Sequence, residues 1–265
     1  MYIQKKIMLF FFCFALVTSL HAQKKTVLLD YYFNNEYKKN EQGELVRFHY
    51  TWEDTAQSGY SKLGAIFTKS GFELKSLSVA PDPANLKNAS IYLMVDPDTE
   101  KETAIPHFID KAHINAISSF IKEGGIVVIM ANDSGNVEFN HLNQLTETFG
   151  IHLNGDSKSK VYNDKYEMAA FHIPLKDPIF TTAQKVYLKE VSSLQLSKNA
   201  SPILIHQSEH YVVGAKANFG KGMMIVIGDP WFYNEYLNGR LGYTNGWDNE
   251  KAAIDFVGWL ANHVK

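Results

Sequence analysis

Three neighbouring segments decide the fold class: IYLMVD (91–96), DKAHINAISSFIKEGG (110–125) and IVVIMAN (126–132). The first and third are short apolar runs that end in polar residues, which is typical of buried strands. In the second, Asp110 stands where it can cap a helix, isoleucines recur at helical spacing, and Gly124 and Gly125 end the helix. A strand, a helix and a second strand at this spacing predict a βαβ unit with parallel strands.

The same alternation continues on both sides of this unit. Strands are predicted at 26–30, 72–77 and 223–227, and a hairpin at 203–206 and 211–216. Further helices are expected at 60–67, at 142–149, and from Asp248 onward with Ile254, Val257 and Leu260 on the inner face. The sequence therefore predicts an α/β protein with a single domain over residues 23–265. We expect a flavodoxin-like three-layer sandwich with a mainly parallel sheet.

The first 22 residues have the pattern of an export signal. Lys5 and Lys6 precede an apolar run at 7–17, and the segment closes with Leu20-His21-Ala22. The run is too short to span a bilayer comfortably. We expect cleavage near Ala22 and a mature protein in the periplasm or outside the cell, with no membrane span.

Cleavage would change the composition of the chain. The segment carries two lysines and no acid, so the formal charge moves from −2 to −4. It also carries the single cysteine, Cys13, so the mature chain would have no thiol for disulfides, metal ligation or nucleophilic catalysis. Without a basic surplus, nucleic acid is not an expected partner.

Polar and aromatic residues follow four of the predicted strands. In open parallel sheets, ligands bind beyond the carboxyl ends of the strands. The predicted ligand-binding residues are Asp30, Asn34, Glu36, Asp96, Asp98, Asn132, Asp133, Asp229, Trp231, Tyr233 and Asn234. Carboxylates and amides accept hydrogen bonds from sugar hydroxyls, and aromatic rings stack on sugar C–H faces. The alternative is that these residues only cap helices and close turns.

The sequence gives weaker support for hydrolysis and for metal binding. Asp133, Asp229 and Asp96 are candidates for the acid and base of a glycan hydrolase. The segment 96–100 is rich in acids but lacks the glycine and the length of a calcium loop. The segment 131–135 lacks the first glycine of a nucleophile elbow, and no H-E-x-x-H motif occurs. No metal and no cofactor are predicted.

Five segments together resemble a known domain. They are LLDYYFNNE (28–36), FHYTWE (48–53), VDPDTEKE (95–102), NDSGN (132–136) and GDPWFYNEY (228–236). They are similar to a DUF4350-like domain of polysaccharide-degrading bacteria, which is often appended to unsaturated rhamnogalacturonyl hydrolases. The resemblance extends from about residue 26 to residue 263.

The resemblance implies a class I glutamine amidotransferase-like fold, similar to that of trehalose-utilisation proteins. True amidotransferases of this class need a cysteine at the elbow, so their reaction is not expected here. The implied role is that of an exported accessory protein in the degradation of uronic-acid-containing polysaccharides. It would bind an oligosaccharide or assist a glycoside hydrolase; the alternatives are a glycan hydrolase and a partner that only docks to an enzyme.

Overall fold

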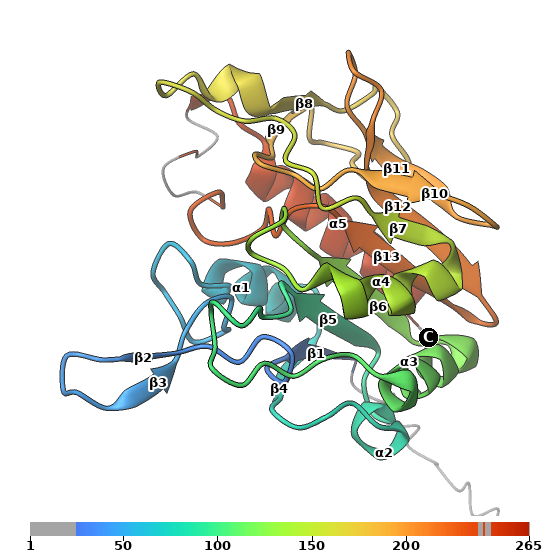
Figure 1. The fold of residues 1–265 in the computed structure, drawn as a ribbon. Helices are drawn as coiled ribbons and strands as arrows, with labels where there is room; N and C mark the ends of the chain where they lie inside the picture. Colours follow the sequence, from blue (N-terminus) through green and yellow to red (C-terminus); the bar gives the residue numbers. More distant parts are fainter. Residues whose placement is uncertain (1–24, 238–240, 242–244, 265) are drawn as a thin grey trace, which may run out of the picture.

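The structure is a computed structural model that describes residues 25–237, 241 and 245–264 (Figure 1). The predicted signal segment 1–22 and Cys13 lie outside the described residues, so the expectation of export stays a prediction. Within the described part of the chain, no helix has the length and apolar character needed to cross a membrane.

Five parallel strands form the centre of the main sheet. Their order is β4 (Glu73–Leu77), β1 (Thr26–Asp30), β5 (Ile91–Val95), β6 (Ile126–Met130) and β13 (Gly222–Ile227). Each neighbouring pair is parallel. In chain order this is the 2-1-3-4-5 arrangement of flavodoxin-like sheets. The predicted strands and their parallel pairing are confirmed.

Four antiparallel strands extend the sheet beyond β13. Strand β12 (Val212–Phe219) pairs with β13 on one side. It also pairs with β11 (Ser201–Ile205), and β11 and β12 form the predicted hairpin. Strand β12 also pairs with β10 (Leu194–Leu196), which pairs with β7 (Ile151–Leu153). Two small hairpins lie apart from this sheet: β2 (Tyr37–Lys39) with β3 (Leu45–Arg47), and β8 (Ala170–His172) with β9 (Lys185–Tyr187).

Helices cover both faces of the sheet and make it the middle of three layers (Figure 1). Helices α1 (Ser61–Lys69) and α5 (Asn249–His263) share a core with Val27 and Leu29 of β1. Helices α2 (Pro83–Leu86), α3 (Lys111–Glu123) and α4 (Phe139–Thr146) share the other core with Leu28. Two 3₁₀ turns, η1 (Glu147–Phe149) and η2 (Tyr166–Ala169), complete the helical segments. Alternate residues of a strand thus enter opposite cores, as the pleat requires.

The ends of the predicted helices are largely as expected. Asp110 caps α3, accepting a hydrogen bond from the backbone of His113, and Gly124 follows the last turn with φ 122°. One prediction for α5 is wrong: Ile254, expected on the inner face, is 50% exposed, while Val257 and Leu260 are buried as expected. Steps of three residues lag the helical period by about 60° each, so Ile254 falls outside the buried stripe.

Candidate functional site

The carboxyl ends of four parallel strands meet at one edge of the sheet. The Asn34 side chain, beyond β1, donates a hydrogen bond to the Asp96 carbonyl, beyond β5, at 3.0 Å. The Asn132 backbone, beyond β6, donates to Oδ1 of Asp96 at 2.7 Å. Since β13 lies beside β6, Asp229 ends at the same edge. The prediction that these strand ends gather at one edge is confirmed.

A cavity of about 470 Å³ opens at this edge. Its size is in the range of small-molecule pockets. We call it the rim cavity, and it is lined by Glu36, His49, Tyr50, Ala56, Gln57, Ser58, Asp96, Glu102, Asn132, Asn136, Lys189, Glu190, Tyr233 and Glu235. The lining comes from the strand ends and from segments 36–58, 189–190 and 233–235, which are far apart in the sequence.

The backbone is strained at four positions around the rim cavity. His49, Tyr50, Asp96 and Glu190 have φ values of 69°, 51°, 35° and 54°. Residues with side chains rarely adopt this left-handed region, and each such residue costs on the order of 1–3 kcal/mol. Backbone hydrogen bonds hold two of these residues in place. Tyr50 donates its backbone N–H to the carbonyl of Ser58, and Asp96 donates its backbone N–H to the carbonyl of Met130. Concentrated strain of this kind is common at functional sites.

Two glycines allow the walls of the rim cavity to approach. A Cβ on Gly59 would lie 1.8 Å from the carbonyl oxygen of Asp54, and one on Gly228 would lie 1.9 Å from that of Ser192. The second contact accompanies a hydrogen bond from the Ser192 backbone to the Gly228 carbonyl at 2.9 Å. Glycine at these positions therefore fixes the 54–59 loop and the segment that carries Lys189 and Glu190.

Asp96 is the central acid of the rim cavity, and it is only 4% exposed. Burial raises its pKa to about 7, although the hydrogen bonds from Asn132 and Tyr50 and the charge of His49 act in the opposite direction. Burial also raises the pKa of Glu102, which accepts hydrogen bonds from the backbone and hydroxyl of Thr99. At neutral pH, Asp96 can therefore either hold or release a proton.

His49 and Glu36 form an ion pair beside these acids, with 2.8 Å between Nδ1 and Oε1. The imidazole stacks on the rings of Phe48 and Tyr50, with centroid distances of 5.1 and 4.0 Å. Burial disfavours the charged imidazole, but the hydrogen bond and charge of Glu36 outweigh it and raise the pKa of His49. The contact with Glu36 thus favours the charged form of His49, and Glu36 has its partner within the chain.

Asp229 lies behind the cavity wall and does not line it. It is 2% exposed, and burial, followed by the charge of Asp96, raises its pKa well above the usual range. It accepts a hydrogen bond from the backbone of Lys189, while its Oδ2 has no partner. Asp229 therefore supports the segment at Lys189 as a buried acid whose protonated form is favoured by burial, which corrects the expectation that it contacts a ligand.

Trp231 is fully buried, which corrects the expectation that it stacks on a ligand. Its ring stacks on Phe232 at 4.1 Å and meets the edge of Phe180 at 5.6 Å. The turn after β13 carries the indole inward, into the core shared with α5. Tyr233 alone of the two predicted stacking residues lines the rim cavity.

Four further predicted residues, Asp30, Asn34, Asp98 and Asn234, bind the backbone of neighbouring segments instead of lining the cavity. Asp30 accepts from the backbones of Phe33 and Asn34 and from the hydroxyl of Tyr92. Asp98 accepts from the backbone of Asn35 at 2.7 Å, and burial raises its pKa to about 7.

Asn234 holds the start of α1 and the loop before it. Its side chain accepts from the backbone of Lys62 and donates to the carbonyls of Asp54 and Ala56. Asp30, Asn34, Asp98 and Asn234 therefore hold turns and loops in place, which is the alternative to ligand binding that the sequence left open. Asp133 is also outside the cavity lining, and it accepts from the side chain of Asn136.

Glu36, Asp96, Asn132 and Tyr233 are the predicted residues that line the rim cavity. Sequence reasoning missed its other charged and aromatic lining residues: His49, Tyr50, Glu102, Lys189, Glu190 and Glu235. The segments 48–53, 95–102 and 228–236 that carry the family resemblance contain four of them. Lys189 and Glu190 lie in an irregular segment without any motif, and only the fold brings them to the rim.

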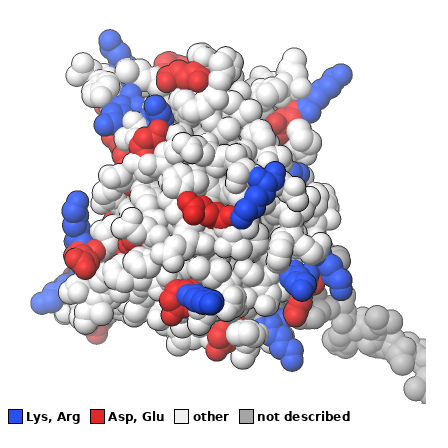
Figure 2. Space-filling view, turned by 45° about the vertical axis from the view of Figure 1, so that its right-hand side comes forward, with Lys and Arg blue, Asp and Glu red and all other residues white. Residues whose placement is uncertain are grey.

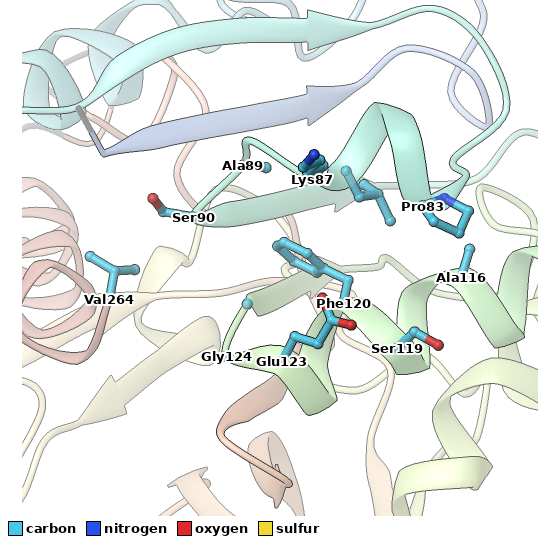
Figure 3. Close-up of a pocket in the computed structure, with 12 residues that line it drawn as sticks. Pro83, Lys87, Ala89, Ser90, Ala116, Ser119, Phe120, Glu123, Gly124 and Val264 are labelled. Atoms are coloured by element: carbon cyan, nitrogen blue, oxygen red, sulfur yellow. The ribbon is translucent and has the colours of Figure 1, made fainter. Parts of the chain in front are cut away.

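A second cavity of about 400 Å³ lies at the opposite edge of the sheet, between α2, α3 and the starts of β5 and β6 (Figure 3). Pro83, Ser90, Phe120, Glu123 and Gly124 are among its lining residues, and we call it the opposite cavity. Glu123 is the single acid among the described residues that line it. It lacks the converging acids of the rim cavity, so we take the rim cavity as the candidate site.

Charge elsewhere is mixed. On the face drawn in Figure 2, acidic and basic side chains are interspersed without a large patch of either sign. Among the residues that the structure describes, no three His, Cys, Asp or Glu side chains are grouped so that they could hold a metal ion.

No family model and no curated protein match this chain. Several solved structures share its fold. A structure described as the mmIFT52 N-terminal domain is 17% identical, with a TM-score of 0.65 over 89% of this chain and 97% of that one. The cytoplasmic protein STM1381 from Salmonella typhimurium LT2 is 10% identical, with a TM-score of 0.56 over 91% and 100%.

A β-galactosidase from Rahnella sp. R3 is also 10% identical, with a TM-score of 0.53 over 90% of this chain but 31% of that enzyme. Likeness at these identities shows the fold alone. The chain is an α/β protein that folds as a flavodoxin-like three-layer sandwich.

Proposed function

We propose that the rim cavity binds a carbohydrate, and that the protein is an exported accessory protein of polysaccharide degradation. The observation that carries the binding proposal is the concentration of hydrogen-bonding side chains around 470 Å³ of space at the carboxyl edge of a parallel sheet. Carboxylates and amides there suit sugar hydroxyls, and the rings of Tyr50 and Tyr233 supply apolar faces. Export and the link to polysaccharides rest on the signal-like segment and on the family resemblance.

The test is calorimetric titration of the protein with neutral, acidic and amino oligosaccharides at pH 7. We expect one class to bind, and Asn132→Ala to weaken that binding about tenfold, because Asn132 lines the cavity and is partly exposed. The matched control is Asn115→Ala on the exposed side of α3, which should bind as the wild type does. Absence of binding across all three classes would refute the proposal.

Hydrolysis of a glycan is a second candidate, and one observation favours it. Asp96 lines the cavity with a pKa of about 7, and Glu102 lines the same cavity. A carboxyl group that keeps its proton near neutral pH can act as a general acid. Of the three predicted catalytic acids, Asp229 is behind the wall and Asp133 is outside the lining, so Asp96 is the candidate acid.

Release of reducing sugars separates the two candidates. A hydrolase should lose activity on the alkaline side of about pH 7, as Asp96 ionises, and Asp96→Asn should abolish turnover while sugar binding persists. A wild-type protein that binds a glycan without releasing reducing ends supports the accessory role and refutes hydrolysis of that glycan.

A further inference from the structure

We propose that the ligand of the rim cavity is a sugar with a free amino group, positively charged at neutral pH. This inference rests on the proposed carbohydrate binding and names the class of sugar. It differs from the uronic acids that the family resemblance implies.

The lining of the rim cavity has an excess of acids. Among the lining residues that the structure describes, two are basic and five are acids: Glu36, Asp96, Glu102, Glu190 and Glu235, the last of which has a partner of its own. Both basic side chains already have an acidic partner: His49 pairs with Glu36 at 2.8 Å, and Lys189 with Glu190 at 3.6 Å. Neither of them is left over to bind the carboxylate of a uronic acid.

Asp96 and Glu102 are the acids of the rim cavity that a bound cation would neutralise. In the part of the chain that the structure describes, neither forms an ion pair with a lysine, an arginine or a histidine. Asp96 is 4% exposed and Glu102 is half-buried, so water solvates their charges poorly. An ammonium group in the cavity would supply the opposite charge to both, whereas a uronate would add a like charge.

The protonation of these acids agrees with this reading. Burial raises the pKa of Asp96 to about 7 and that of Glu102 above its usual value, and the charge of His49 offsets this only in part. A bound ammonium group would lower both pKa values. Binding at pH 7 should therefore release protons from the protein.

The other lining residues favour an organic amine over a bare metal ion. Gln57, Ser58 and Asn132 bring neutral donors and acceptors to the cavity, and Tyr50 and Tyr233 bring rings. The volume of about 470 Å³ greatly exceeds that of one ion. No group of three potential ligands suitable for a metal occurs among the residues described. Hydroxyl groups and ring faces on the same molecule as the amine would use the whole lining.

The experiment compares three disaccharides by calorimetric titration at pH 7 and low salt. They are the β-1,4-linked dimer of glucosamine, its N-acetylated form and the dimer of galacturonic acid. We expect the free amine to bind at least tenfold more tightly than the N-acetylated form, and the uronate to bind most weakly. Equal or tighter binding of the N-acetylated sugar or the uronate would overturn the inference and leave carbohydrate binding supported. Absence of binding by every sugar of the wider panel would overturn both.

Glu102→Gln tests the charge directly, because the two side chains have nearly the same shape and glutamine can still accept from Thr99. The variant should reduce the preference for the amine over the N-acetylated form to about twofold or less. Glu123→Gln, in the opposite cavity, is the matched control and should keep the full preference. Circular dichroism and melting temperature confirm that both variants fold. A preference that survives in folded Glu102→Gln would contradict the assigned role of Glu102.

Proton release gives an independent readout. Titrations of the amine in phosphate and in Bis-Tris buffer at pH 6, where the sugar amine is already protonated and Asp96 still holds its proton, should differ in apparent enthalpy by the heat of the protons that the buffer takes up from the protein. Asp96→Asn should reduce this difference. Equal apparent enthalpies for the wild type in the two buffers would contradict charge pairing in the cavity.

Discussion

The two edges of the parallel sheet are built from the same strands, yet they differ in chemistry. At the amino edge, Glu123 is the one acid among the described residues that line the opposite cavity. At the carboxyl edge, the strands end in buried acids, and His49, Tyr50, Asp96 and Glu190 adopt left-handed backbone conformations. Two of these buried acids have structural roles, since Asp30 closes a turn and Asp229 supports the segment at Lys189. The binding function proposed above would account for the third, Asp96, and for the strained residues that line the rim cavity.

The largest expected effect concerns the core beneath the carboxyl edge. Trp231→Ala should reduce the free energy of unfolding by about 3–5 kcal/mol, because it removes a large, fully buried side chain. Chemical denaturation measures this loss. Tyr37→Ala, at a side chain that is 50% exposed, should change stability far less. A loss of under 1 kcal/mol for Trp231→Ala would place the indole at the surface, where it could contact a ligand after all.

The second effect is a fall in stability with rising pH. The pKa of Asp96 rises from 3.8 to about 7 on folding, so the folded state holds a proton that the unfolded state has lost between these values. Its contribution to stability is complete below about pH 4 and is lost as the pH rises toward 7; its size is on the order of 4 kcal/mol at most.

Denaturation at a series of pH values tests this expectation. Asp30 and Asp98, with pKa values raised to about 6 and about 7, act in the same direction over the same window. Asp96→Asn should flatten the dependence in part, because asparagine does not titrate. A wild-type stability that instead increases between pH 4 and pH 7 would mean that other groups dominate the titration.

A smaller effect is expected at Gly228, where the end of β13 lies close to the segment at Ser192. Gly228→Ala should destabilise the fold by about 1–3 kcal/mol, because its Cβ would lie 1.9 Å from the carbonyl oxygen of Ser192. It should also displace Lys189 and Glu190 from the rim cavity and so weaken sugar binding.

The control for this change is Gly258→Ala in α5. Apart from its chain neighbours and the adjacent helix backbone, no atom lies within 4 Å of a Cβ at that position, so alanine should stabilise the helix by about 0.5–1 kcal/mol and leave binding unchanged. Melting temperature and titration on both variants make the comparison. Equal stability of Gly228→Ala and the wild type would show that the 189–192 segment can move without penalty.

The smallest effect is expected at the amino edge. Ser119→Arg places a long side chain beside the opposite cavity from an exposed position of α3. Stability should stay within about 0.5 kcal/mol of the wild type, and sugar binding should not change. Ser58→Arg, in the rim cavity, should abolish sugar binding, because the side chain would fill the space between the acids. The reverse pattern would make the opposite cavity the binding site.

The sequence by itself determined the elements and the class of fold. Apolar runs such as 91–95 and 126–130 predict buried strands because burial on both faces requires it, and Asp110 and Gly124 mark the ends of α3 through local backbone chemistry. Parallel strands also send their carboxyl ends to one edge, so the position of Asp96 and Asn132 at the rim followed from the element order.

Only the tertiary structure decided which side chains reach the cavity. The spacing of Asp229 and Trp231 matches that of rim residues, but the turn after β13 directs both into the interior. Lys189 and Glu190 reach the rim because Gly228 lets a distant segment approach the end of β13. Burial, rather than residue type, sets the high pKa of Asp96. These properties depend on contacts between residues far apart in the chain, which no local pattern encodes.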